Sequence, residues 1–191
     1  LDVAISSGDS KTRSIECDYV ACGYHLIPNI ELAGLLGCRI DGGFVAVDDL
    51  QQTSHSDIYC TGEPTGIGGL DASLIEGRIA GYAAAGQTET ARSLFAKRDK
   101  TRRFTSALNQ AFALRDDLKT LADESTIVCR CEDVQYRQLT GFDNWRSAKL
   151  QTRCGMGPCQ GRVCGAAAEF LFGWTIDPPR PPILPVKLEN L

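Results

Sequence analysis

The spacing of apolar positions divides the chain into regions with different predicted secondary structure. The first region has the pattern of β-strands. Residues 1–86 are rich in glycine and β-branched residues, and their apolar positions alternate in short runs. In "RSIECDYVACG", apolar and acidic side chains alternate from Ile15 onward, which predicts the first strand. The runs "GGFVAVDD" and "SDIYCTG" predict two more short strands, the second of which ends at Gly62.

The segment "GIGGLDASLIEGRIAGYAAAG" has the period of a helix instead. Its larger apolar side chains recur three or four residues apart, and Gly86 marks the predicted stop. These side chains are Leu70, Leu74, Ile75, Ile79 and Tyr82.

Residues 87–125 are basic and contain no proline. Their sequence predicts a connector made of helices, with a break in the helical structure near "KRDKTRRF". Its apolar positions are Leu94, Phe95, Phe104, Leu108, Phe112, Leu118 and Leu121. The charged run favours a solvated helix face, and the alternative is a docking surface for an acidic partner.

Residues 126–176 contain a cysteine module, and residues 177–191 form a tail. In the module, "EDVQYRQLTG", "DNWRSAKLQ" and "CGAAAEFLFGW" predict three short helices. The tail holds five of the eight prolines, so we expect it to be extended polyproline II rather than helix. It also carries apolar Ile183, Leu184, Val186 and Leu188, which favours a strap lying on another surface over a disordered end.

Composition and charge narrow the class of protein. The chain has 191 residues, is 43% hydrophobic, and has room for one core or a core plus a small module. A net charge of −4 argues against nucleic acid or an anionic membrane as the main partner. Neither an apolar run long enough to span a membrane nor an N-terminal signal is visible. The sequence opens without Met, which indicates a processed product or a fragment.

The nine cysteines are unevenly distributed, with five of them in the last third of the chain. Cys129 and Cys131 lie in "VCRCED", and Cys154, Cys159 and Cys164 lie in "TRCGMGPCQGRVCG". Without a sign of secretion, clustered thiols predict metal ligands rather than disulfides. Thiolates select zinc or iron–sulfur clusters, and C-x-C is tight for zinc but suits a cluster. Zinc and metal-free buried cysteines remain the alternatives.

These cysteine motifs resemble the bacterioferritin-associated-ferredoxin type of [2Fe–2S] domain. They are most similar to the version found at the C-terminus of two-dinucleotide-binding flavoproteins, which include the larger subunits of opine oxidases, hydrogen cyanide synthase and amino-acid dehydrogenases. The resemblance implies a cluster held by Cys129, Cys131, Cys159 and Cys164, with Cys154 as a nearby spare. The C-x4-C spacing is wider than that of the simpler ferredoxins, which leaves the choice among the thiols open.

The stretch "GGFVAVDDLQQTSHSDIYCTGE" resembles the last FAD-contacting segment of pyridine-nucleotide-disulfide-oxidoreductase-like flavoproteins. The resemblance implies FAD contacts at Gly62, Glu63, Gly69 and Leu70, with the acid accepting a hydrogen bond from a ribityl hydroxyl. Glu63 stands where that family has Asp. "ACGYHLIPN" resembles the segment in which the chain returns to the FAD domain. GxGxxG fingerprints are missing, so the chain resembles only the C-terminal part of a flavoprotein and would not enclose FAD alone.

No catalytic constellation is visible in the remaining residues. His25 and His55 lack a nearby nucleophile or paired acid, which favours solvent or capping roles. Outside the module, the cysteines form no redox C-x-x-C and are predicted to be small core residues, at positions 17, 22, 38 and 60.

Taken together, the resemblance implies an α/β fragment of a flavoprotein (residues 1–86), the connector, a small mainly helical [2Fe–2S] domain (126–176) and the tail. It implies electron transfer within a cytoplasmic oxidoreductase in which a second, flavin-containing subunit oxidises an amino-acid or opine C–N bond. Peripheral membrane association, through partners and a quinone chain, is compatible with this role. The alternatives are a single-chain flavin dehydrogenase, an NAD(P)H-linked reductase similar to glycerol-3-phosphate dehydrogenase, and a non-enzymatic cluster or zinc module.

Overall fold

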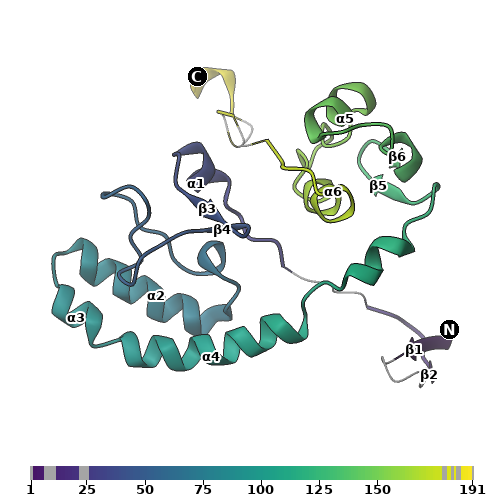
Figure 1. Ribbon diagram of the computed structural model, residues 1–191. Helices are drawn as coiled ribbons and strands as arrows, with labels where there is room; N and C mark the ends of the chain where they lie inside the picture. The colour runs from purple at the N-terminus through teal and green to yellow at the C-terminus, as the bar shows by residue number, and fades with distance from the viewer. Residues whose placement is uncertain are drawn as a thin grey trace.

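The chain begins with a two-stranded antiparallel hairpin. The computed structural model describes residues 2–6, 12–21, 26–177, 180–181, 183 and 186–190. Strand β1 (Asp2–Ser6) pairs with β2 (Thr12–Glu16), placing Asp2 opposite Glu16. The strand expected from Ile15 onward therefore ends at Glu16, and its apolar face is not buried, since Tyr19 is 91% exposed. Figure 1 shows this hairpin apart from the helices, so no packing layer extends it among the described residues.

A second hairpin follows the short helix α1 (Glu31–Leu35). It joins β3 (Ile40–Asp41) to β4 (Phe44–Val45) through Gly42 and Gly43, which both have positive φ, as a two-residue turn requires. The short strand expected in "GGFVAVDD" is thus present. The strand expected in "SDIYCTG" is reduced to one bridge between Gln52 and Tyr59.

Three helices build the first core of the chain. A 3₁₀ turn, η1 (Glu63–Thr65), precedes α2 (Gly69–Ala84), which confirms the predicted helix before Gly86. Helices α3 (Thr88–Arg92) and α4 (Phe95–Ala111) follow, and Figure 1 shows α4 running beside α2. Ile75 and Ile79 pack with Ala91 in this core. Leu70 and Leu74 do not join it, because they lie on the outer side of α2 at 73% and 57% exposure.

Helix α4 continues through "KRDKTRRF", so the expected break is wrong. The segment contains neither glycine nor proline, and three of its charged residues, Arg98, Asp99 and Arg102, form ion pairs. The Arg98 side chain is 6% exposed, forms an ion pair with Asp49 at 3.1 Å, and lies over the ring of Phe95. Arg102 pairs with Glu76 of α2 at 3.3 Å. This charged run therefore fastens α4 to the core instead of forming only a solvated face.

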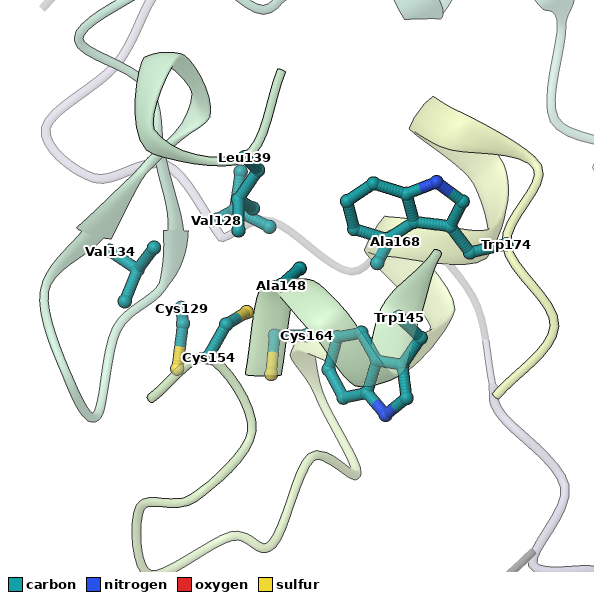
Figure 2. Close-up of a cluster of buried hydrophobic side chains, with 10 residues drawn as sticks. All are labelled: Val128, Cys129, Val134, Leu139, Trp145, Ala148, Cys154, Cys164, Ala168 and Trp174. Carbon is teal, nitrogen blue, oxygen red and sulfur yellow. The ribbon is translucent and has the colours of Figure 1, made fainter. Parts of the chain in front are cut away.

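The cysteine module has its own core. After η2 (Asp116–Leu121) come β5 (Ile127–Cys129), β6 (Val134–Gln135), η3 (Tyr136–Gln138), α5 (Trp145–Thr152) and α6 (Cys164–Phe172). The helix expected at "EDVQYRQLTG" is therefore a strand and a 3₁₀ turn, because Val134 pairs in the ladder with Cys129. Figure 2 shows the buried residues of this core, which are Val128, Cys129, Val134, Leu139, Trp145, Ala148, Cys154, Cys164, Ala168 and Trp174.

The tail is only partly described. Its end contains a 3₁₀ turn, η4 (Leu188–Asn190), where we expected extended chain throughout. Four of its five prolines and Leu184 lie outside the described residues, as do Cys22 and His25. None of the helices formed by the described residues has the length and apolar surface that crossing a bilayer requires.

Candidate metal centre and flavin-facing loop

Three chain segments bring the five thiols of the module together. Strand β5 ends at Cys129, and the turn that follows carries Cys131. Helix α5 starts at Asn144, whose side chain accepts the backbone N–H of Ser147 at 2.9 Å, and stops at a left-handed residue just before Cys154. The loop 155–163 carries Cys159 and leads into α6 at Cys164. The thiols therefore converge from a strand end, a helix end and a helix start.

The inner thiols form a buried group that can hold a metal ion. The Sγ atoms of Cys129, Cys154 and Cys164 lie within 4.8 Å of one another, and all three residues are buried. In Figure 2 they lie beside Ala148 and Trp145 in the core of the module. Three convergent sulfurs are a soft donor set, which suits zinc or iron.

The outer thiols, Cys131 and Cys159, lie nearer the surface. Cys131 is exposed, Cys159 is half-buried, and their side chains share a hydrogen bond. Cys131 also interacts electrostatically with Cys129, and Cys159 does so with Cys164. Of the four sequence-predicted ligands, Cys129 and Cys164 therefore belong to the compact buried group, whereas Cys131 and Cys159 form an outer pair. The sequence did not reveal that the fifth thiol, Cys154, lies deeper than two of them.

Backbone amides of the loop point at the outer sulfurs. Hydrogen bonds from the backbone N–H of Val163, and also of Gly161 and Arg162, lower the pKa of Cys159 despite partial burial. The backbone N–H of Cys159 donates to Cys131, but the neighbouring thiols outweigh it and the pKa of Cys131 is raised. Amides aimed at sulfur stabilise thiolates, as cluster sites require.

The pKa of one inner thiol, Cys164, also departs from its usual value. The pKa of Cys164 is strongly raised, first by its hydrogen bond with Cys154 and then by burial. Neighbouring thiols and burial both disfavour the thiolate form of Cys164. A bound cation reverses this preference, because coordinating thiols are deprotonated. The donor set therefore fits a thiolate-bound metal centre.

Glycines let the loop close around the thiols. A Cβ atom added at Gly157 would lie 2.2 Å from Cβ of Cys131. A Cβ atom at Gly155 would lie 2.6 Å from Cζ2 of Trp145. The ion pair between Arg153 and Glu132, at 2.8 Å, joins the two cysteine-bearing turns. Only the glycines among these groups were recognisable from sequence, since contacts with Trp145 and Glu132 join distant segments.

The predicted flavin-contacting residues gather at the start of α2. Glu63 Oε1 accepts the backbone N–H of Gly69 at 2.9 Å, and the backbone N–H of Gly62 donates to Glu76 Oε2 at 3.0 Å. Glu63 Oε2 is buried and has no hydrogen-bond partner among the described residues. Leu70 points outward and is exposed. A buried acceptor without a donor fits a ligand hydroxyl, such as one on the ribityl chain of FAD.

An open cavity of about 610 Å³ lies beside this loop. It is bounded by β4, by the Thr65–Gly68 segment and by α4, and the Glu76–Arg102 pair lines it. The hydroxyl of Thr65 donates to the carbonyl of Gly62 at 2.9 Å and keeps the loop closed. The residues predicted to contact a flavin therefore lie in a loop that is held in place by contacts with α2 and α4.

The remaining candidate residues, a histidine and three cysteines, have contacts and burial typical of residues that stabilise the fold. A ring nitrogen of His55, Nε2, hydrogen-bonds with the carbonyl of Gly37 at 3.1 Å, which is a turn-stabilising contact. Cys38 is buried and contacts the hydroxyl of Thr53, while Cys17 and Cys60 are half-buried. Burial raises the pKa of the Cys60 thiol, which disfavours a reactive thiolate.

The sequence is similar to subunits of known oxidases and synthases. It is 30% identical to an opine oxidase subunit of Rhizobium meliloti (strain 1021), with 91% of this chain and 43% of the relative aligned. It is also 30% identical to hydrogen cyanide synthase subunit HcnB of Pseudomonas aeruginosa (strain PAO1), with 80% and 37% aligned. The corresponding opine oxidase subunit of Agrobacterium tumefaciens (strain Ach5) is 29% identical, with 98% and 43% aligned.

The similarity covers only part of the length of each relative. The chain spans about two fifths of the length of these curated relatives, 37–43%. No family model matches the chain, and no solved structure does. At about 30% identity, the relatives support the family of oxidase and synthase subunits that the cysteine motifs resemble, and with it oxidoreductase activity at family level.

Proposed function

We propose that this chain is the electron-transfer portion of a flavin and iron–sulfur dehydrogenase or oxidase subunit. The observation that carries the proposal is the convergence of five thiols around a glycine loop whose backbone amides point at sulfur. Relatives named as subunits of opine oxidase and hydrogen cyanide synthase support the same role.

The proposed ligands of a [2Fe–2S] cluster are Cys129, Cys131, Cys159 and Cys164. Cys129 and Cys164 lie in the compact buried group, and Cys131 and Cys159 receive backbone hydrogen bonds, which supports this choice. A [2Fe–2S] cluster, when bound, transfers single electrons. The protein's own contribution is to hold the four sulfurs, to direct amides at them, and to keep the inner end dry beneath Trp145.

The proposed FAD contacts are Gly62, Glu63, Gly69 and Leu70. The unpartnered Glu63 Oε2 would accept a hydrogen bond from a ribityl hydroxyl, and the amide end of α2 would face the flavin. A flavin, when bound, accepts two electrons and releases them one at a time. The rest of the FAD site would come from outside this chain, which spans two fifths of its relatives.

The proposed substrate is an amino acid or opine, oxidised at a C–N bond by a second, flavin-containing subunit. The names of the relatives support this substrate class and a multi-subunit assembly. The two electrons removed from the substrate would pass through this subunit to an acceptor, which can be a membrane quinone chain. We place the assembly in the cytoplasm, with membrane contact through partners.

A zinc-binding module is the second candidate, because Cys129, Cys154 and Cys164 alone form a compact buried site. Affinity purification of the full-length protein from its host, without oxygen, separates the candidates. We expect a flavin-containing second chain, bound FAD, and cluster absorbance that bleaches when an amino acid or opine is added. Stoichiometric zinc without labile sulfide or flavin would establish the zinc module instead.

A further inference from the structure

An ion pair joins the cysteine module to the part of the chain that resembles a flavoprotein. Arg162, in the loop that leads into α6, pairs with Glu31 at the start of α1, with 2.8 Å between Nη2 and Oε2. Between the described residues of 26–86 and those of 126–176, it is the one ion pair or hydrogen bond. It therefore connects two parts of the chain that have separate cores.

Both partners are held in place by other contacts. The backbone N–H of Glu31 donates to Asn29 Oδ1 at 3.2 Å, at the first turn of α1. The guanidinium of Arg162 also donates to the carbonyl of Cys159 at 3.4 Å and to that of Ile183 at 3.2 Å. A planar guanidinium can serve several acceptors at once. Arg162 therefore reaches Glu31 while it is fastened to the loop that carries Cys159.

The module is attached to the rest of the chain at a second place, the connector. There Lys119 of η2 lies 5.3 Å from the centre of the Phe170 ring in α6. Figure 1 shows α6 on the side of the module that faces α1. Attachment at the connector alone would let the module turn about it. A second contact with α1 limits that rotation.

Helix α1 is itself tied to the segment that leads to the proposed FAD contacts. Just after α1, the backbone N–H of Arg39 donates to Ser54 Oγ at 2.9 Å, and the carbonyl of Gly37 hydrogen-bonds with His55 Nε2 at 3.1 Å. This segment continues through residue 60 to Glu63. A series of contacts thus runs from the cysteine loop, through α1, to the proposed FAD contacts.

We propose that the Glu31–Arg162 ion pair fixes the cysteine loop relative to the proposed FAD contacts, which makes Glu31 and Arg162 positioning residues for electron transfer. This inference rests on the proposed function. Electron transfer slows steeply as the distance between two centres grows, so a module that can turn would receive electrons more slowly. Each transfer takes one electron from reduced flavin and adds it to the cluster, and neither residue gains or loses an electron or a proton.

The first test measures hydrogen–deuterium exchange by mass spectrometry in the full-length protein. Glu31→Gln removes one charge and leaves the cysteine loop unaltered, and it should speed amide exchange in α1 and in residues 155–163. Arg162→Gln should speed exchange in α1 to a similar extent. The double variant should add nothing, because either change alone already breaks the pair. A role of Arg162 confined to the module would leave exchange in α1 unchanged.

The second test follows electrons in the purified assembly by stopped-flow absorbance. In Glu31→Gln, iron and sulfide content and the rate of flavin reduction by an amino acid or opine should be unchanged, whereas reduction of the cluster should slow severalfold. Added salt should slow cluster reduction in the wild type and much less in the variant, because salt screens the ion pair. Glu89→Gln, which breaks an exposed pair with Arg92, is the matched control and should change none of these quantities.

Unchanged exchange in α1 in both single variants would overturn the inference and leave the proposed function intact. Faster exchange with unchanged electron transfer would also overturn it, because the pair would then join the two parts without positioning them. Loss of iron and sulfide from Glu31→Gln would overturn it by assigning the pair to cluster retention. Absence of labile sulfide from the wild type would instead refute the proposed function, and this inference with it.

Discussion

Because Gly157 has no side chain, the loop that carries it can approach the turn that carries Cys131. Gly157 leaves the space into which Cβ of Cys131 fits, and its backbone is not in the left-handed region. The requirement for glycine here is therefore steric rather than conformational. The sequence indicated that the backbone comes close to the metal centre at the glycines, but it did not show which thiol each glycine accommodates.

Gly157→Ala should displace Cys131 and reduce cluster occupancy. The new methyl group would lie 2.2 Å from Cβ of Cys131 and would have to displace it. Overpacking of this kind costs about 1–3 kcal/mol. Iron and sulfide analysis alongside thermal unfolding measures both effects. Gly141→Ala is the control, since a Cβ atom there meets nothing within 4 Å. Equal cluster content in the two variants would contradict this explanation.

Glu63 carries the proposed hydrogen bond to a flavin, because its Oε2 is buried without a partner among the described residues. In the full-length protein, Glu63→Ala should weaken FAD binding about tenfold to hundredfold, because a charge-assisted hydrogen bond is worth roughly 1.5–3 kcal/mol. Fluorescence titration of the flavin-free protein measures the affinity. Glu89→Ala, an exposed position on α3 paired only loosely with Arg92, should leave it unchanged. Unaltered affinity in Glu63→Ala would remove this carboxylate from the site.

Among the elements, α4 of the connector contacts the loop that precedes α2. Glu76 of α2 is 8% exposed at its side chain, accepts the backbone N–H of Gly62, and pairs with Arg102 of α4. The loop before α2 is thus held by the Glu76 carboxylate, whose charge is balanced by Arg102 from another helix. The sequence pattern could not predict this pairing, because it joins positions 26 residues apart across two helices.

Arg102→Met should destabilise the loop, because it leaves the Glu76 carboxylate without its ion-pair partner. The Arg102 side chain is 42% exposed, so solvent screens part of the loss, and we expect about 1–2 kcal/mol in the free energy of unfolding. Arg92→Met removes an exposed pair and should cost less than about 0.5 kcal/mol. Urea unfolding of both variants makes the comparison, and equal losses would show that the α2–α4 pair is dispensable.

The sequence predicted element types better than it predicted which side chains face inward. Helix α2 and the gathering of thiols followed from spacing and glycine content. The outward positions of Leu70 and Leu74 did not, because apolar residues lie on more than one side of α2. Nor did the depth of Cys154, which follows a left-handed residue, Arg153, whose side chain pairs with the distant Glu132.

Across the whole molecule, Arg162 joins the cysteine loop to two distant segments. Its guanidinium pairs with Glu31 of α1 at 2.8 Å and donates to the carbonyl of Ile183 in the tail at 3.2 Å. Figure 1 shows the tail passing α1 beyond the end of α6. These contacts favour the interpretation of the tail as a strap over that of a free end.

Deleting residues 178–191 should leave the cluster intact and lower the melting temperature by about 2–4 °C, the shift expected for a loss of about 1 kcal/mol in a chain of this size. If the strap also contacts a partner protein, assembly with it should weaken. Deleting only residues 187–191 keeps Ile183 and is the matched control. Identical melting temperatures for both truncations and the intact protein would show that Ile183 does not act as a strap.

Iron and acid-labile sulfide per chain, in protein made with ample iron and purified without oxygen, test the proposed metal centre most directly. We predict about two irons and two sulfides in the wild type and in Cys154→Ser. Cys159→Ser and Cys164→Ser should each lose the cluster or make it labile. Stoichiometric zinc without sulfide would contradict a [2Fe–2S] centre. Loss of iron in Cys154→Ser with retention in Cys164→Ser would contradict the proposed ligands.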